Sequence, residues 1–134
     1  MEGLIRINPP SLFDSTGTGY SQISVSEPGR LAFISGQVAW DAGTAPTPER
    51  FGEQAALVVR NCRRALSEAR ATPADLVMAR VYVVDLDRPR VAELVPYLKD
   101  LFEGAQPSLT CIGVAALAAP DLLLEIEMVA RVPS

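Results

Sequence analysis

The fold is decided by two stretches near the end of the chain, Leu109–Val114 (LTCIGV) and Leu122–Arg131 (LLLEIEMVAR). Both are rich in aliphatic residues, and a short Ala/Pro connection separates them, so we predict two strands. Because successive strand residues point to opposite faces, the second stretch has one apolar face and one face that carries acids. The apolar face comprises Leu124, Ile126, Met128 and Ala130, and the other comprises Glu125, Glu127, Val129 and Arg131. The first face suits a core, whereas the two acids of the second need a partner, a solvated cleft or a catalytic role.

Length and composition indicate one globular domain spanning residues 1–134, with 49% hydrophobic and 21% charged residues. A net charge of −4 argues against a nucleic-acid partner bound through a basic surface. No apolar run is long enough to span a bilayer, and the N-terminus lacks the apolar segment of a signal peptide, so no membrane partner is expected. We therefore expect a cytoplasmic protein in which Cys62 and Cys111 are free thiols.

The chain contains no histidine. This excludes the commonest acid/base at neutral pH and the commonest metal ligand, together with nucleophile arrangements that require histidine. We expect no metal site and no cofactor. Any catalysis must use Glu, Asp, Tyr, Cys, backbone groups or water.

Three strands are predicted in the first part of the chain, at Leu4–Ile7, Gln22–Ser26 and Leu31–Gln37. Asn8-Pro9-Pro10 ends the first strand, because proline cannot continue a hydrogen-bonded ladder. Glu27-Pro28-Gly29-Arg30 has proline and glycine where a β-turn favours them. The second and third strands are therefore predicted to form a hairpin.

Two helices with an intervening strand are predicted in the centre of the chain. The first helix spans about Pro48 to Arg70, with Thr47 as its cap and Pro48 at its first position. Leu76–Val84 is rich in β-branched residues and is predicted to be a strand. The second helix extends to Phe102, and Pro96 should either kink it or leave it regular only from about residue 94. Its predicted inward side chains are Val91, Leu94, Val95, Leu98 and Phe102.

The resulting order, β-β-β-α-β-α-β-β, predicts an α+β domain of two layers, with both helices on one face of a mixed sheet. The other face of the sheet then remains apolar and uncovered. We therefore expect the protein to form an oligomer.

Glu125 is the leading candidate for chemistry, because Leu124 and Ile126 flank it. Burial would suit its carboxyl group to proton transfer. The alternative is an ion pair with an arginine across the sheet or across a subunit boundary. Glu127 is then either a like-charged neighbour or the residue that takes the ion pair.

Four further positions each have a functional and a structural interpretation. Ser35-Gly36-Gln37 ends a buried strand, where glycine permits close approach of a ligand, although a bulge or strand end is the favoured interpretation. Tyr20 either points its hydroxyl group into a cleft or packs its ring on the core. Trp40 either walls a ligand pocket or covers the core edge. Cys111 is favoured as a small core residue, since no neighbouring cation would lower its pKa.

Taken in order, several short motifs resemble the Rid family, also called YjgF-like, whose best-known members are enamine/imine deaminases. The resemblance spans nearly the whole chain, and the order and spacing of its motifs are more specific than any one of them. The motifs are Arg6-Ile7-Asn8-Pro9, Gly19-Tyr20-Ser21, Ile34-Ser35-Gly36-Gln37, Val83-Val84-Asp85-Leu86, Cys111 and Glu125-Ile126-Glu127.

The resemblance implies a chorismate-mutase-like fold and a homotrimer that binds a small molecule in each of three intersubunit clefts. In the family's deaminases, an arginine two residues before the cysteine holds the substrate carboxylate. The cysteine backbone and a glutamate of the C-terminal strand hold the attacking water, and a tyrosine closes the site. The catalytic residues implied here are Glu125 and Tyr20, and the substrate-binding candidates are Ser35, Gly36, Trp40, Leu109 and Cys111.

Leu109 occupies the position of that arginine, and this is the main departure from the family pattern. Leucine cannot form a bidentate contact with a carboxylate. We therefore expect a Rid-like enzyme of altered specificity, acting on an imine or enamine that is not a simple 2-imino acid. The alternative is a non-catalytic trimer that binds a small molecule or has a structural role. An endoribonuclease activity is poorly supported by an acidic chain without histidine.

Overall fold

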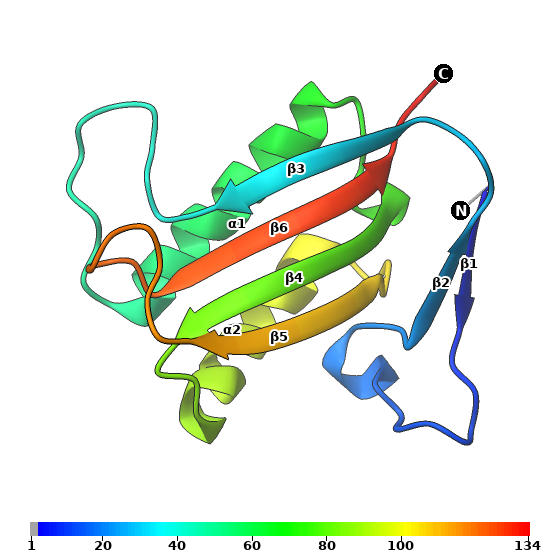
Figure 1. Cartoon of the computed structure of the whole chain (residues 1–134), viewed down its shortest axis with the longest axis horizontal. Coiled ribbons are helices and arrows are strands. Elements are labelled where there is room, and N and C mark those ends of the chain that lie inside the picture. The colour runs from blue at the N-terminus through cyan, green and yellow to red at the C-terminus, as the bar shows by residue number, and fades with distance from the viewer. Residues whose placement is uncertain (1–2) are drawn as a thin grey trace.

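The computed structural model describes residues 3–134 and has a four-stranded sheet with both helices on one face (Figure 1). Strands β4 and β5 are parallel, while β6 pairs antiparallel with both β3 and β4, so the sheet is mixed as predicted. In sheet order the strands are β3 (Leu31–Gln37), β6 (Leu124–Arg131), β4 (Leu76–Val84) and β5 (Ser108–Val114). The helices are α1 (Phe51–Glu68) and α2 (Arg88–Phe102). The predicted α+β two-layer architecture is confirmed.

The predicted hairpin is wrong, because the second and third strands do not pair. Instead, β2 (Ile23–Ser26) pairs with β1 (Leu4–Ile7) in a separate antiparallel ribbon, and β3 pairs with β6. The turn motif at residues 27–30 redirects the chain from the ribbon to the sheet (Figure 1). A turn motif shows where the chain reverses but does not determine which strands pair. The seven-residue β3 pairs with β6, which is longer and more apolar than β2.

The core lies between the sheet and the two helices. On β6 the predicted apolar face is confirmed, since its four side chains are at most 2% exposed. Each helix contributes a row of buried side chains that packs against this face of the sheet. The core members from these elements are Phe51, Ala55, Val58, Val59, Cys62, Leu66, Leu94, Leu98, Leu101, Phe102, Leu124, Ile126, Met128 and Ala130.

Helix α1 begins three residues later than predicted. Its N-cap is Arg50, which has extended backbone and makes no side-chain capping bond, so the predicted cap at Thr47 and start at Pro48 are wrong. The Pro48 carbonyl instead accepts a 2.8 Å hydrogen bond from the Gln54 side chain. The helix ends at Glu68, and Arg70 follows with a left-handed φ of 61°.

Helix α2 continues through Pro96 from Arg88 to Phe102, and Asp87 caps it by accepting a hydrogen bond from the Arg90 backbone. Val91 is 39% exposed rather than inward, and Leu101, absent from the predicted stripe, is fully buried. The buried positions 94, 98, 101 and 102 follow helical spacing from the second turn onward, so the first turn lies outside the core.

Gln54 is a fully buried polar residue that joins α1 to the connection between β5 and β6. Its amide nitrogen donates to the carbonyl of Pro48 at 2.8 Å and to that of Asp121 at 2.7 Å. Its amide oxygen accepts from the Leu123 backbone at 2.9 Å. Two of the three bonds go to the segment that leads into β6, so Gln54 fixes the approach of the strand that carries Glu125.

The face of the sheet away from the helices is open in the single chain. Phe33 is 76% exposed and Leu31 is 42% exposed, and both lie on the edge strand β3. One face of the β1–β2 ribbon is also apolar and exposed, with Ile5 at 57% and Val25 at 44%. Among residues 3–134, neither helix is long and apolar enough to cross a membrane.

Candidate functional site

Four polar side chains form a block in the middle of the open sheet face. Tyr82 on β4 is aligned with Glu125 on β6, and Arg80 is aligned with Glu127. Because residues two apart on a strand share a face, all four side chains lie on the side away from the helices. The predicted placement of the two acids opposite the core is therefore confirmed, and β4 supplies their neighbours.

Glu127 is the acid that takes the ion pair. One of its carboxylate oxygens accepts a hydrogen bond from the Tyr82 hydroxyl group and lies 3.6 Å from an Arg80 guanidinium nitrogen. The hydrogen bond to Glu127 is the largest influence on Tyr82 and raises the pKa of its phenol, because ionisation would break that bond. Desolvation and the negative charges of Glu127 and Glu125 act in the same direction, and Arg80 opposes them. Glu127 is thus held in a structural network.

Glu125 has a different environment from Glu127. Its side chain packs on Gly36 of β3, where a methyl group would lie 2.7 Å from the Glu125 Cγ and closer still to its carboxyl group. The register of β3 shifts between Ile34 and Gln37, which confirms the predicted irregularity at this strand end. Glu125 is half-buried and forms no ion pair within residues 3–134. The structure therefore brings Gly36 and Glu125 together and leaves the carboxylate without a cationic partner there.

Tyr20 lies beside the beginning of β5. The backbone of the next residue, Ser21, donates a 3.0 Å hydrogen bond to Pro107 and forms a parallel bridge with Ser108. The Ser15 hydroxyl group donates to the Tyr20 carbonyl at 2.8 Å, which fixes the loop that precedes β2. The half-buried Tyr20 is therefore anchored to the same strand as Leu109 and Cys111.

Tyr20 and Glu125 do not meet within one chain. Tyr82 of β4 is aligned with Glu125 on one side and with Ile112 of β5 on the other. Ile112 is four residues beyond Ser108, and β5 is two strands away from β6. Strand rise and spacing then place the Cα atom of Ser108 about 16 Å from that of Glu125. The candidate residues thus form two separate groups, one at β5 and one at the contact between β3 and β6.

Leu109 and Cys111 are aligned with Ala79 and Val81, whose side chains face the helices. Leu109 is half-buried and packs against the core. Cys111 is exposed in the single chain, so its predicted role as a core residue is wrong there. It lies on the edge strand β5, which has a neighbouring strand on one side only. Partial desolvation of its thiol still raises the pKa of Cys111, and a hydrogen bond with the Ile112 backbone opposes that shift. The thiol is therefore not activated as a nucleophile.

The two remaining candidates, Ser35 and Trp40, lie at the end of β3 and just after it. Ser35 is exposed on β3 beside Gly36. Trp40 is 48% exposed and lines a hollow of about 380 Å³ between the end of β3 and α1. Asn61 of α1 holds the loop there by donating to the carbonyls of Val38 at 3.0 Å and Trp40 at 2.6 Å.

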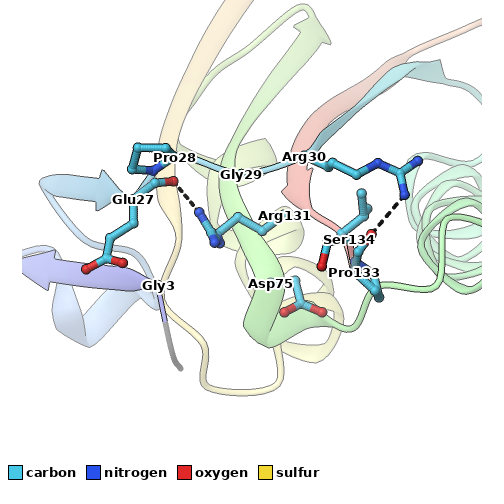
Figure 2. Close-up of a pocket in the computed structure, with 10 residues that line it drawn as sticks. Gly3, Glu27, Pro28, Gly29, Arg30, Asp75, Arg131, Pro133 and Ser134 are labelled. Atoms are coloured by element: carbon cyan, nitrogen blue, oxygen red, sulfur yellow. Dashed lines mark hydrogen bonds between the residues drawn. The ribbon is translucent and has the colours of Figure 1, made fainter.

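A larger hollow of about 520 Å³ contains none of the predicted site residues. Both of its arginines are already engaged. Arg131 donates to the Glu27 carbonyl and Arg30 donates to the Pro133 carbonyl (Figure 2), and Arg131 also donates to the Ser26 hydroxyl group. Asp75 accepts from the Thr72 backbone at 2.8 Å. This region fastens the ribbon to the sheet.

Sequence reasoning missed Tyr82 and Arg80, although alternation along Leu76–Val84 places both on the face opposite the core. No group of three or more His, Cys, Asp or Glu residues that would hold a metal ion occurs in residues 3–134. The two cysteines are free, as predicted.

The chain is an α+β protein of two layers that carries an acid on its open sheet face. Comparisons with known proteins identify its family. Residues 14–132 match the family model described as Endoribonuclease L-PSP, and the chain therefore belongs to this family, the YjgF/Rid family. A solved Yersinia pestis structure described as YyfB, of the conserved Rid protein family and of unknown function, is 37% identical. It superposes with a TM-score of 0.91 over 97% of this chain and 99% of that one.

Curated relatives agree with this assignment. A RutC family protein of Haemophilus influenzae is 34% identical over 76% of this chain and 79% of its own length. The putative reactive intermediate deaminase TdcF of Escherichia coli is 29% identical over the same shares. The yeast protein MMF1, described as mitochondrial, is 25% identical over 96% of this chain and 86% of its own length.

Proposed function

We propose that the protein is a small-molecule enzyme of the Rid type that hydrolyses an imine or enamine other than a simple 2-imino acid. The observation that carries this proposal is the environment of Glu125, which packs on Gly36 without an ion pair in the described chain while Glu127 is engaged by Tyr82 and Arg80. Because Glu127 takes the ion pair, the Glu125 carboxylate remains available for proton transfer. The name of the relative TdcF supports a deaminase-type reaction.

In the proposed reaction, water attacks the carbon of the C=N bond while the Glu125 carboxylate takes a proton from the water. Glu125 then delivers the proton to the substrate nitrogen, which gives a carbinolamine. Glu125 next takes the proton of the carbinolamine hydroxyl group and passes it to the nitrogen, so that the carbon–nitrogen bond breaks and a carbonyl compound and ammonia are released. Tyr20 donates a hydrogen bond, and backbone N–H groups near Gly36 or Cys111 polarise the substrate. Water supplies the oxygen of the carbonyl product.

The proposed site requires more than one copy of the chain. Tyr20 and Glu125 lie in separate groups within one protomer, and Phe33 is 76% exposed beside the Glu125 group. A homotrimer, implied by the family resemblance, would cover the open sheet face and place the two groups on opposite sides of an intersubunit cleft. We also propose a cytoplasmic location, supported by the two free cysteines.

The proposed specificity follows from Leu109. An aliphatic side chain at the position where the resemblance places arginine cannot bind a carboxylate, so an uncharged or larger substrate is favoured. The same residue supports the second candidate function, a non-catalytic binding or structural trimer, because Leu109 packs against the core as an ordinary apolar residue.

Turnover with the Glu125→Gln variant tests the proposal. Two imine sources are compared: an amine oxidase acting on benzylamine, which gives an imine without a carboxylate, and an amino acid oxidase acting on leucine, which gives a 2-imino acid. We expect faster hydrolysis of the first imine and loss of that activity in Glu125→Gln, because glutamine cannot accept the proton. The exposed helix variant Glu68→Gln is the control. Unchanged turnover in Glu125→Gln would exclude the acid/base role, and binding without turnover by the wild type would favour the second candidate.

A further inference from the structure

A groove of about 350 Å³ lies between α1 and α2, on the helix side of the molecule. Its volume is in the range of sites for metabolite-sized ligands. Since the helices cover one face of the sheet, the groove is separated by the whole sheet layer from the open face that carries Glu125 (Figure 1). Its lining includes Val59, Arg60, Arg63, Arg64, Tyr97 and Asp100.

The groove concentrates positive charge in an acidic protein. Arg60, Arg63 and Arg64 are spaced three and four residues apart on α1, so they share one side of the helix. Asp100 pairs with Arg63 at 2.9 Å, and its backbone carbonyl accepts a second 2.9 Å bond from the same guanidinium. Within residues 3–134, neither Arg60 nor Arg64 has an ion-pair partner. The lining thus has an excess of two positive charges in a chain whose net charge is −4.

Arg60 is also poorly satisfied by the protein. Its Nε atom is buried and has no hydrogen-bond partner among the described residues, and its terminal nitrogen makes only a 3.4 Å bond to the Asn61 side chain. A buried N–H group without an acceptor is costly, and such a group in a native protein calls for a specific explanation. An anion seated beside Arg60 would supply both the acceptor and the compensating charge.

The walls of the groove suit an organic ligand rather than a bare ion. Tyr97 is partly buried against the core, and its hydroxyl group lies over α1, where a methyl group on Gly52 would be 3.1 Å away. The ring therefore forms a fixed aromatic wall, and Val59 adds apolar surface. Planar guanidinium groups beside an aromatic ring match carboxylate or phosphate groups attached to a flat body.

We propose that this groove is a second ligand site, which binds a small organic anion bearing phosphate or carboxylate groups through Arg60 and Arg64 against Tyr97. The groove is built entirely from α1 and α2 of one chain. The site is therefore independent of the reaction proposed at Glu125.

Calorimetric titration of the full chain tests the proposal with two probes, inorganic pyrophosphate for phosphate ligands and citrate for carboxylate ligands. We expect saturable binding of at least one probe, with affinity lowered about tenfold in Arg60→Gln and in Arg64→Gln, because each variant removes charge-assisted hydrogen bonds. Arg88→Gln, an exposed arginine outside the groove, should bind as the wild type does. The probe that binds more tightly identifies the ligand class.

An NMR measurement locates the bound probe. The Nε–H signal of Arg60 is assigned by its loss in Arg60→Gln. Its chemical shift should change as the probe is added and should saturate at the same probe concentration as the calorimetric heat. The proposal would be overturned by the absence of saturable binding to both probes, by equal weakening in Arg88→Gln, or by an Arg60 signal that does not move at saturation.

Discussion

Glu125 and Glu127 are two residues apart on one strand and share a face, yet they differ in every contact. Glu127 is hydrogen-bonded by Tyr82 and paired with Arg80, whereas Glu125 packs on a glycine. The sequence places both acids on the same face through alternation alone. It does not show which acid is engaged, because the answer depends on β4, a strand more than forty residues earlier in the chain.

The Tyr82–Glu127 contact predicts a pH dependence. Replacing Glu127 with glutamine removes the largest influence on Tyr82, so the pKa of the phenol should fall toward its ordinary value of 10.0. Because the folded-state pKa is raised, the stabilisation from this hydrogen bond is complete below pH 10 and is lost as pH rises through the raised pKa. Ultraviolet titration of tyrosinate measures the shift, with Tyr82→Phe to assign the signal among three tyrosines.

The control for this titration is Glu68→Gln, an exposed acid on α1 that should leave the phenol unchanged. The loss of stability above pH 10 should also be shallower in Glu127→Gln than in the wild type. A Tyr82 titration that is identical in Glu127→Gln and the wild type would contradict the assigned contact.

Among the elements, periodicity predicted the strands and helices well and their connections poorly. The alternation of β6 predicted its core face without error. The pairing of β2 and the start of α1 were wrong. In both cases the deciding interaction is with a distant segment. Strand β2 pairs with β1, and Gln54 links the loop before α1 to residues 121–123. Local signals such as Pro-Gly or Thr-Pro carry no information about such partners.

Gln54 provides a test of this long-range control. Replacing it with leucine keeps the volume similar but removes the partners of two part-buried carbonyl groups and one part-buried N–H group. We expect the free energy of unfolding to fall by about 3 kcal/mol, since each unsatisfied buried group is costly. Urea denaturation measures the change, with the exposed neighbour Glu53→Gln as the control. A loss as small as that of the control would show that these bonds do not hold the connection.

Across the whole molecule, the dominant feature is a sheet covered on one face only. The open face carries Phe33, the polar block around Glu125 and the uncovered edge of β3. The sequence predicted both the uncovered face and an oligomer. It did not predict that Tyr20 and Glu125 would fall in two separate groups, since that separation follows from the sheet order β3-β6-β4-β5.

Phe33 tests whether the open face is an interface between copies of the chain. A charge there should oppose burial, so Phe33→Asp should dissociate the assembly in sedimentation experiments. Val91→Asp places the same charge on α2, where the side chain is 39% exposed on the helix layer, and should leave the assembly intact. An assembly that Phe33→Asp leaves unchanged would place the interface elsewhere.

The shared site is tested most directly by mixing two inactive variants, Glu125→Gln and Tyr20→Phe, under conditions that exchange subunits. If each site takes Tyr20 from one copy and Glu125 from its neighbour, random mixing restores about one quarter of the sites. We predict that hydrolysis of the imine without a carboxylate recovers to about that fraction of the wild-type rate. Mixed assemblies that are shown to form by mass spectrometry but recover no activity would contradict the account.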